Sequence, residues 1–360
     1  MKFEKLAPGP VVVVGYGWSA LAAVGFLVKE NRPVVWIAGT ASRMHPVLPT
    51  FHAGAGLETW KELARVYDIE TGEEKIGNFI REFKNKSFRS SEPQALVEKL
   101  WTPEVQFARE GEVRLEIPLI EIEARIRANL IDGDYPNLKR IEGTPLASIQ
   151  IEEHKLISVK LGSGETIACS NLIFADRWNA LSSIEGMPKG LSFTRKRGAA
   201  GILQAALTHD APPDGSPIEA YFAPLTRDAG EDFDRNVWGY FSSDGKQSYW
   251  STCVTSDEGE DNHLIAKKLR KMKASVDKMF AGTEFISNLK SEKVTFHESI
   301  LFSEGLAPSE VLTLGKTQCV FFVTDSYGPS SALEQLSFLG HSEGPYAETK
   351  NVDAFHSATL

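Results

Sequence analysis

Two glycines separated by a single residue, Gly15 and Gly17, form the pattern in this sequence that most directly indicates chemistry. They follow four consecutive valines, which are typical of a buried strand, and they precede an apolar stretch typical of a helix. A glycine turn between a strand and a helix lets the backbone come close to a phosphate group, and the free N–H groups at the helix start bind its charge. The sequence therefore predicts a site for the pyrophosphate of a dinucleotide at this turn.

The whole turn matches the G-x-G-x-x-A form of the dinucleotide fingerprint, and all of its residues are candidates for cofactor binding. They are Gly15, Tyr16, Gly17, Trp18, Ser19 and Ala20. One feature of the fingerprint is missing, because the position that usually carries Asp or Glu for the ribose hydroxyls is Ala38, followed by Gly39. Arg43 lies in the loop beyond, where it is either a phosphate partner or a surface salt-bridge residue.

A second candidate site follows the apolar segment 320–323, which reads as a buried strand and is followed by a predicted helix at 330–339. The residues concerned are Thr324, Asp325, Ser326 and Ser331. Ligands of open α/β sheets lie beyond the carboxyl ends of the strands, so Asp325 and this helix start are expected near Gly15. In the functional interpretation Asp325 binds cofactor hydroxyls; the alternative is a plain helix-entry turn.

A strand–helix–strand unit must position the first site, and the sequence predicts strands at 11–14 and 34–37 around a helix at 19–29. Further along, short alternating segments around tight turns predict a β-meander. Its expected strands are 147–152, 156–161 and 166–169. The apolar segment 171–175 is expected to return to the parallel sheet.

Longer strands rich in aromatic residues follow the meander and are expected to pair in antiparallel fashion. They are 199–208, 218–223, 236–242 and 247–255. A basic helix at 263–280 has an apolar stripe, from Leu264 to Met279, that is expected to pack on this sheet. The aromatic residues of the strands either line a substrate pocket or belong to the core; they are Tyr221, Trp238, Tyr240 and Trp250.

These elements predict an α/β protein with two domains. One is a Rossmann-type dinucleotide-binding domain built on a central parallel sheet and a β-meander. The other is a discontinuous substrate domain built on a mixed antiparallel sheet. The dinucleotide-binding domain is expected at 1–67, 135–190 and 311–360, and the substrate domain at 191–310. Segment 68–134 is expected to be a helical insertion or cap. Helices are expected at 57–67, 94–100 and 120–130.

Composition excludes several classes of protein. With 42% hydrophobic and 24% charged residues, the chain has the composition of a soluble globular protein. A net charge of −9 argues against nucleic acid as a partner. Three isolated cysteines fit buried thiols in a reducing cytoplasm and show no metal-binding spacing, so no metal is expected. The uncharged segment 11–28 is long enough for a membrane helix, but its glycines and valines favour the strand–turn–helix interpretation.

Three stretches together resemble the FAD-binding fold shared by amine oxidases, glutathione-reductase-type enzymes and related flavoproteins. They are GYGWSA, LISVKLGSGETIACSNLIFAD and VFFVTDSYGPSSALEQ. The resemblance implies FAD as cofactor, with Asp325 at the ribitol and the following helix directed at the flavin. The chain departs from the family pattern at Ala38, at Thr324, where glycine is usual, and at Trp18, where smaller residues are usual.

Three functional hypotheses follow. The first is an FAD-dependent oxidoreductase that transfers hydride from a small organic substrate, such as an amine, to the flavin. The second is an NADP-binding reductase, which the missing acid and Arg43 would suit. The third is a non-catalytic protein that keeps the flavoprotein scaffold without standard FAD binding. The sequence does not indicate a catalytic acid or base.

Overall fold

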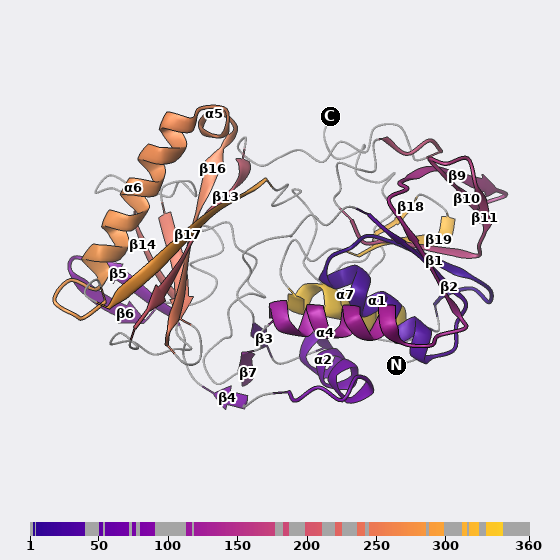
Figure 1. The fold of residues 1–360 in the computed structure, drawn as a ribbon, viewed down its shortest axis with the longest axis horizontal. Coiled ribbons are helices and arrows are strands. Elements are labelled where there is room, and N and C mark those ends of the chain that lie inside the picture. The colour runs from indigo at the N-terminus through magenta and orange to yellow at the C-terminus, as the bar shows by residue number, and fades with distance from the viewer. Residues whose placement is uncertain are drawn as a thin grey trace.

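The computed structural model describes residues 3, 5–39, 50–52, 55–71, 74–76, 80–90, 113–116, 119–176, 183–186, 199–210, 220–224, 236–241, 245–285, 288–298, 312–314, 317–323 and 329–340. Arg43, Thr324, Asp325, Ser326 and the helix expected at 94–100 lie outside these ranges. The elements form two groups: a parallel sheet with its helices and a small meander on the right of Figure 1, and a mixed sheet with one long helix on the left.

A six-stranded sheet carries the glycine turn. In order across the sheet its strands are β18 (Leu312–Leu314), β19 (Thr317–Phe322), β12 (Asn171–Phe174), β1 (Val11–Val14), β2 (Val34–Ala38) and β8 (Leu138–Glu142). The pairings from β19 to β8 are parallel, and β18 pairs antiparallel with β19 at one edge. The parallel sheet predicted from the sequence is therefore confirmed, whereas β8 was not expected.

The four valines of β1 are needed because both faces of this central strand are covered. Val11 and Val13 face a core that includes the helices, while Val12 and Val14 face a core shared with the meander. All four are at most 5% exposed. A strand buried on both faces has no polar face, which explains the continuous β-branched run.

Four helices contribute to the core on one face of this sheet. They are α1 (Trp18–Lys29), α2 (Ala55–Val66), α4 (Leu119–Asp132) and α7 (Pro329–Gly340). The tyrosine that follows α2, Tyr67, donates a hydrogen bond of 3.1 Å from its hydroxyl to the Gly25 carbonyl of α1. The helices expected at 19–29, 57–67, 120–130 and 330–339 are confirmed within one or two residues, the uncertainty usual for helix ends.

The meander packs on the opposite face. Its strands are β9 (Leu146–Glu152), β10 (Lys155–Leu161) and β11 (Thr166–Ala168), paired antiparallel. Leu156, Val159 and Leu161 lie on the core shared with Val12 and Val14. Helices, parallel sheet and meander thus form three layers. The sequence predicted the sheet and the meander, and the structure shows how they are layered.

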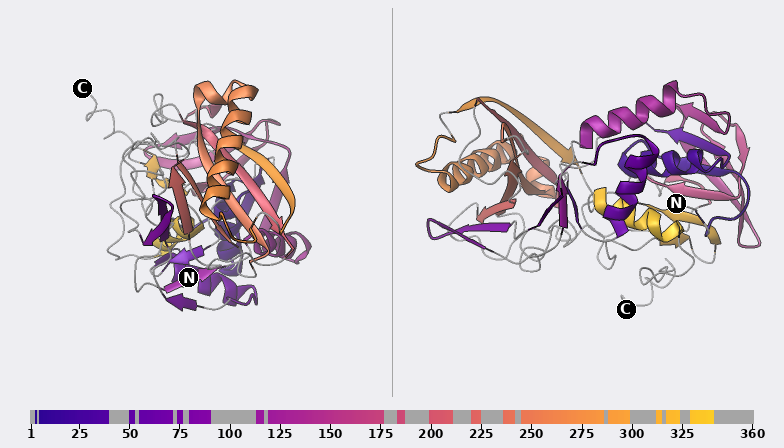
Figure 2. Two further views of the ribbon diagram at one scale, coloured as in Figure 1. Left: turned by 90° about the vertical axis from the view of Figure 1, so that its left-hand side faces the viewer. Right: turned by 90° about the horizontal axis from the view of Figure 1, so that it is seen from below.

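The mixed sheet has seven strands. In order they are β17 (Leu289–Glu298), β13 (Ala199–His209), β16 (Gln247–Thr255), β15 (Asn236–Phe241), β14 (Ala220–Pro224), β5 (Ile80–Lys84) and β6 (Ser87–Ser90). All neighbours pair antiparallel except β14 and β5, which are parallel. Helix α6 (Asn262–Met279) lies along one face, as the two views in Figure 2 also show. Its stripe is buried at Met272, Val276 and Met279, but Leu264 is 37% exposed, so the stripe is shorter than predicted.

Segment 68–134, expected to be a helical insertion or cap, contains strands as well as a helix in the described ranges. Besides α4 it contains β4 (Glu74–Ile76), β5, β6 and β7 (Val113–Glu116). Strands β4 and β7 form a small sheet with β3 (Thr50–His52), whereas the β5–β6 hairpin extends the mixed sheet. The hairpin was missed because its turn, Asn85 and Lys86, lacks glycine although both residues have positive φ, 54° and 63°. The domain boundaries themselves remain a prediction.

Membrane-spanning character can be judged for the helices in the described ranges. None of them is both long enough and apolar enough to cross a bilayer.

Candidate functional site

Gly15 occupies a position that no other residue fits. Its φ is +136°, and a Cβ atom added there would lie 2.2 Å from the carbonyl oxygen of Ala175 at the end of β12. The same atom would lie 3.3 Å from the Cβ of Ala20 in the first turn of α1. The turn is therefore pressed between a strand end and a helix, which explains both the first glycine and the alanine of the fingerprint.

The start of α1 offers uncapped hydrogen-bond donors. Gly17 is its N-cap residue and has an extended backbone (φ −74°, ψ −172°), with no side-chain hydrogen bond to the helix start. The first intrahelical bond there runs from Leu21 N–H to the Gly17 carbonyl, at 3.0 Å. The first N–H groups of a helix have no acceptor within the helix itself, which is why helix starts of this kind bind anions.

Ser19 adds a hydroxyl to this helix start. The residue is fully buried, and its Oγ has no hydrogen-bond partner in the described part of the chain. A buried hydroxyl without a partner is costly, so a ligand acceptor at this point would satisfy it. Together with the close-packed Gly15 turn, this orphaned hydroxyl shows that the residues present fit the diphosphate of a dinucleotide.

Two side chains from elsewhere hold the carbonyl groups of the turn. Trp36, fully buried on β2, donates from Nε1 to the Gly15 carbonyl at 2.8 Å. Arg127 of α4 donates from Nη2 to the Tyr16 carbonyl at 2.8 Å. Both bonds fix the orientation of the peptide groups in the turn before any ligand arrives.

The Arg127 guanidinium also lies over the Tyr16 ring, with its central carbon 3.5 Å from the ring centroid. Burial lowers the pKa of Arg127, but an arginine remains charged at neutral pH despite such a shift. Its Nη1 is buried and has no partner among the described residues. Arg127 thus places a positive charge, with one donor unused, beside the predicted nucleotide site.

Position 38, the last residue of β2, is an alanine where the fingerprint expects an acid. Ala38 is 2% exposed and faces the helix-side core. Its partner across the parallel pairing with β8 is Glu142, whose carboxylate accepts a hydrogen bond from Arg140. The Arg140 guanidinium lies 5.4 Å from the Trp36 ring centroid. Sequence reasoning missed both charged residues because β8 was not predicted.

The other candidate residues are placed as follows. The Trp18 side chain is 1% exposed and packs against Trp60 of α2, with ring centroids 5.9 Å apart, so only its backbone belongs to the turn. A Cβ atom on Gly39 would lie 3.4 Å from Oδ2 of Asp176, which brings the ends of β2 and β12 close together. Ser331 lies in the first turn of α7.

The mixed sheet separates the four aromatic candidates into two pairs. Tyr221 and Trp250 belong to the aromatic core beneath α6, where both contact Phe280 at centroid distances of 5.4 and 5.6 Å. Trp238 and Tyr240 alternate with residues of that core along β15, so they lie on the opposite face. Tyr221 and Trp250 are therefore core residues, while Trp238 and Tyr240 remain candidates for the substrate side.

A polar group is buried within the same aromatic core. His209 is 2% exposed, its ring centroid lies 4.8 Å from that of Phe285, and its Nε2 lies 3.0 Å from the Ser248 hydroxyl. Trp250 donates to the same hydroxyl at 2.9 Å, which leaves the hydroxyl proton free to be donated to Nε2. Burial lowers the pKa of His209, so the neutral ring is favoured.

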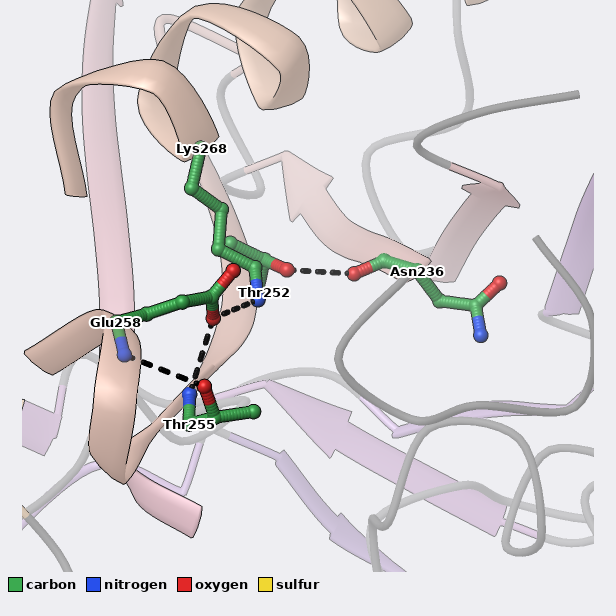
Figure 3. A network of polar contacts seen from close by, with 5 residues as sticks. All are labelled: Asn236, Thr252, Thr255, Glu258 and Lys268. Atoms are coloured by element: carbon green, nitrogen blue, oxygen red, sulfur yellow. Dashed lines mark hydrogen bonds and ion pairs between the residues drawn. The ribbon is translucent and has the colours of Figure 1, made fainter. Parts of the chain in front are cut away.

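A second polar network closes one end of the mixed sheet, where α5 (Ser256–Gly259) begins (Figure 3). Thr255 and Glu258 form a capping box, with the Thr255 N–H donating to the Glu258 carboxylate at 3.0 Å. Lys268 of α6, 4% exposed, also donates to this carboxylate. Nearby, the Thr252 hydroxyl donates to the Asn236 carbonyl at 2.8 Å. These contacts have a structural role in joining α5, α6 and the sheet.

Metal binding has no structural support in the described ranges, where no group of three or more histidine, cysteine or carboxylate side chains is arranged to hold an ion.

No protein-family model and no curated protein sequence matches this chain. Solved structures do match it along most of its length. An oxidoreductase from Methanosarcina mazei has a TM-score of 0.57 and 13% sequence identity, covering 92% of this chain and 100% of that one. L-proline dehydrogenase from P. horikoshii has a TM-score of 0.54 and 11% identity, covering 93% and 92%. The p-nitrophenol 4-monooxygenase PnpA from Pseudomonas putida DLL-E4 has a TM-score of 0.54 and 12% identity, covering 92% and 79%.

By their names these structural neighbours are an oxidoreductase, a dehydrogenase and a monooxygenase. This chain shares their fold, which confirms the α/β architecture with a Rossmann-type parallel sheet that was expected from the sequence. At such low sequence identity the likeness establishes the fold, and function must be argued from the site.

Proposed function

We propose that the protein is an FAD-dependent oxidoreductase that accepts hydride from a small organic substrate. The observation that carries the proposal is the turn at Gly15, which is packed too tightly for any side chain and opens onto an uncapped helix start with the orphaned Ser19 hydroxyl. These are the features that a diphosphate requires. The shared fold of the flavoenzyme neighbours supports FAD as the dinucleotide.

Bound FAD would supply the redox chemistry, with the flavin ring as the hydride acceptor. The protein's own residues would bind and orient the cofactor. The α1 N–H groups and Ser19 hydroxyl would hold the diphosphate, while Arg127 and Trp36 keep the carbonyl groups of the turn directed away from it. Asp325 would bind the ribitol hydroxyls, as the sequence resemblance implies.

The substrate would be bound between the flavin and the face of the mixed sheet that lies opposite α6. Trp238 and Tyr240 on that face are large and amphipathic, and they can exclude water from a reacting centre. The sequence resemblance to amine oxidases makes amines the first class of substrate to test.

An NADP-binding reductase is the second candidate. The observation that favours it is the pair of arginines, Arg127 and Arg140, near a β2 end that lacks an acid. Each guanidinium has a buried nitrogen without a partner in the described ranges, and arginine is well suited to a 2′-phosphate.

Thermal unfolding with added nucleotides tests the two candidates together. A ligand that binds only the folded protein raises the midpoint temperature in proportion to the logarithm of its concentration. The first proposal predicts stabilisation by FAD at micromolar concentration and little by NADP or NAD. Stabilisation by NADP alone would favour the second candidate, and no response to any dinucleotide would favour a scaffold that has lost its cofactor.

A further inference from the structure

The end of β2 lacks the acid that a dinucleotide-binding unit places there, yet a carboxylate stands on the adjacent strand at the same level. In the parallel pairing of β2 with β8, Ala38 is the register partner of Glu142. Strands of one sheet lie about 4.8 Å apart, a distance that the longer glutamate side chain can span. The sequence alone could not show this, because the pairing joins segments that are far apart in the chain.

Glu142 also lies on the correct face of the sheet. Register partners in a sheet share a face, and Ala38 belongs to the helix-side core, as does Trp36 two residues earlier. Arg140, two residues before Glu142, places its guanidinium over the Trp36 ring. Ile141 between them packs instead into the core shared with the meander. Glu142 is therefore on the side of the sheet where the absent acid would have been.

The ion pair with Arg140 orients this carboxylate without covering it. Nη2 of Arg140 donates to Oε1 of Glu142, while the Glu142 side chain is 59% exposed. An ionised carboxylate accepts hydrogen bonds at both oxygens, so Oε2 and the remaining lone pairs of Oε1 are available to a ligand. Two vicinal hydroxyl groups are a suitable ligand because each can donate one bond.

We propose that Glu142 replaces the missing acid at position 38 and binds the ribose hydroxyls of the adenosine half of FAD. The inference rests on the proposed function, since it assigns one part of the same site. Arg140 is a positioning residue for this carboxylate. The arrangement favours a ribose with a free 2′-hydroxyl, because a 2′-phosphate at this point would face the negative charge of Glu142.

The plain alternative is an exposed ion pair with no ligand. Such pairs contribute little to stability, so the substitution Glu142→Gln should leave the fold intact under either interpretation. Ligand affinity then reports on the site alone. A matched control is available on the same strand, where Lys139 pairs with Glu165 at 2.7 Å on the meander side.

The test measures the dissociation constant of FAD by fluorescence titration for the wild-type protein and for Glu142→Gln, Glu142→Ala and Glu165→Gln. We expect both Glu142 substitutions to weaken FAD about 10-fold or more, since bonds to a charged group are lost. Glu165→Gln should bind as the wild type does. Ala38→Glu added to Glu142→Ala should recover most of the affinity, because it returns the acid to the position where the fingerprint expects it.

Equal FAD affinity in the wild type and Glu142→Gln would overturn the assignment of Glu142 while leaving the proposed function standing. An equal loss in Glu165→Gln would overturn it as well, because the effect would not be specific to the helix side of β8. A wild-type protein without measurable FAD affinity would contradict the proposed function itself. If Glu142→Gln instead strengthened NADP binding, the ribose site would belong to the second candidate.

Discussion

The guanidinium of Arg127 makes two contacts with Tyr16, one with its backbone and one with its ring. Its Nη2 donates to the Tyr16 carbonyl at 2.8 Å, and its central carbon lies 3.5 Å from the centroid of the Tyr16 ring. A helix more than a hundred residues away in the sequence thus fixes the residue between the two glycines. The turn is held in shape by the protein before a cofactor binds.

Replacing Arg127 by methionine should weaken FAD binding about 10-fold, because the hydrogen bond and the cation–π contact are lost while the aliphatic packing is largely kept. Fluorescence titration with FAD provides the measurement. Arg125→Met is the matched control, since Arg125 is an exposed arginine on the same helix. Equal affinity in the two variants would show that the contact with Tyr16 has no role in binding.

Gly15→Ala should abolish FAD binding and destabilise the fold by more than about 3 kcal/mol, because the new Cβ would clash with the Ala175 carbonyl. Gly164→Ala separates this clash from backbone strain. Gly164 has φ +91°, but a Cβ there would meet nothing within 4 Å. Gly164→Ala should therefore lower the free energy of unfolding by only about 1–2 kcal/mol. Chemical denaturation measures both losses, and similar values for the two variants would contradict the close packing at Gly15.

Replacing Glu258 should cost more stability than replacing its ion-pair partner Lys268. Lys268 is 4% exposed whereas Glu258 is 26% exposed, so Glu258→Gln leaves a buried ammonium without its counter-charge. We expect a loss of about 2–4 kcal/mol for Glu258→Gln and a smaller loss for Lys268→Met, since water can reach the remaining carboxylate. The double variant should be more stable than Glu258→Gln alone, and denaturation of all four proteins in a double-mutant cycle tests this.

Stability should fall on acidification through the titration of His209. Burial lowers the pKa of His209 in the folded state, so below the unfolded value of about 6.5 the unfolded chain binds more protons. The stability that the neutral His209 ring contributes to the folded state is therefore fully present above pH 6.5, and it is lost as the pH falls towards the pKa of His209 in the folded state. His209→Gln should flatten the stability profile below pH 6.5, and chemical denaturation at a series of pH values measures this.

The sequence predicted the strand–turn–helix–strand unit because its signals are local. The valines of β1 and the tight turn at Gly15 each depend on immediate neighbours or on burial, and both are visible in the chain itself. The parallel sheet and the meander followed from the same patterns. The division of the aromatic candidates did not, since it depends on how β14, β15 and β16 are aligned with one another.

The charged residues around the turn could not be predicted from the sequence. Strand β8 reads Leu-Lys-Arg-Ile-Glu, which has too few apolar residues to stand out as part of a buried sheet. Without β8 there was no reason to place Arg140 or Glu142 beside Trp36 and Ala38. Arg127 was likewise hidden among the other charges of α4, because only the packing of α4 on α1 brings it to Tyr16.

The visible absorption spectrum of the purified protein, recorded after incubation with FAD and removal of the unbound cofactor, tests whether the folded chain binds a flavin. Mass spectrometry of the small molecules released on denaturation would identify what was bound. We expect flavin absorption bands in the folded protein and release of about one FAD per chain. A colourless protein that releases no FAD would contradict the proposed function and would favour a scaffold that binds no flavin.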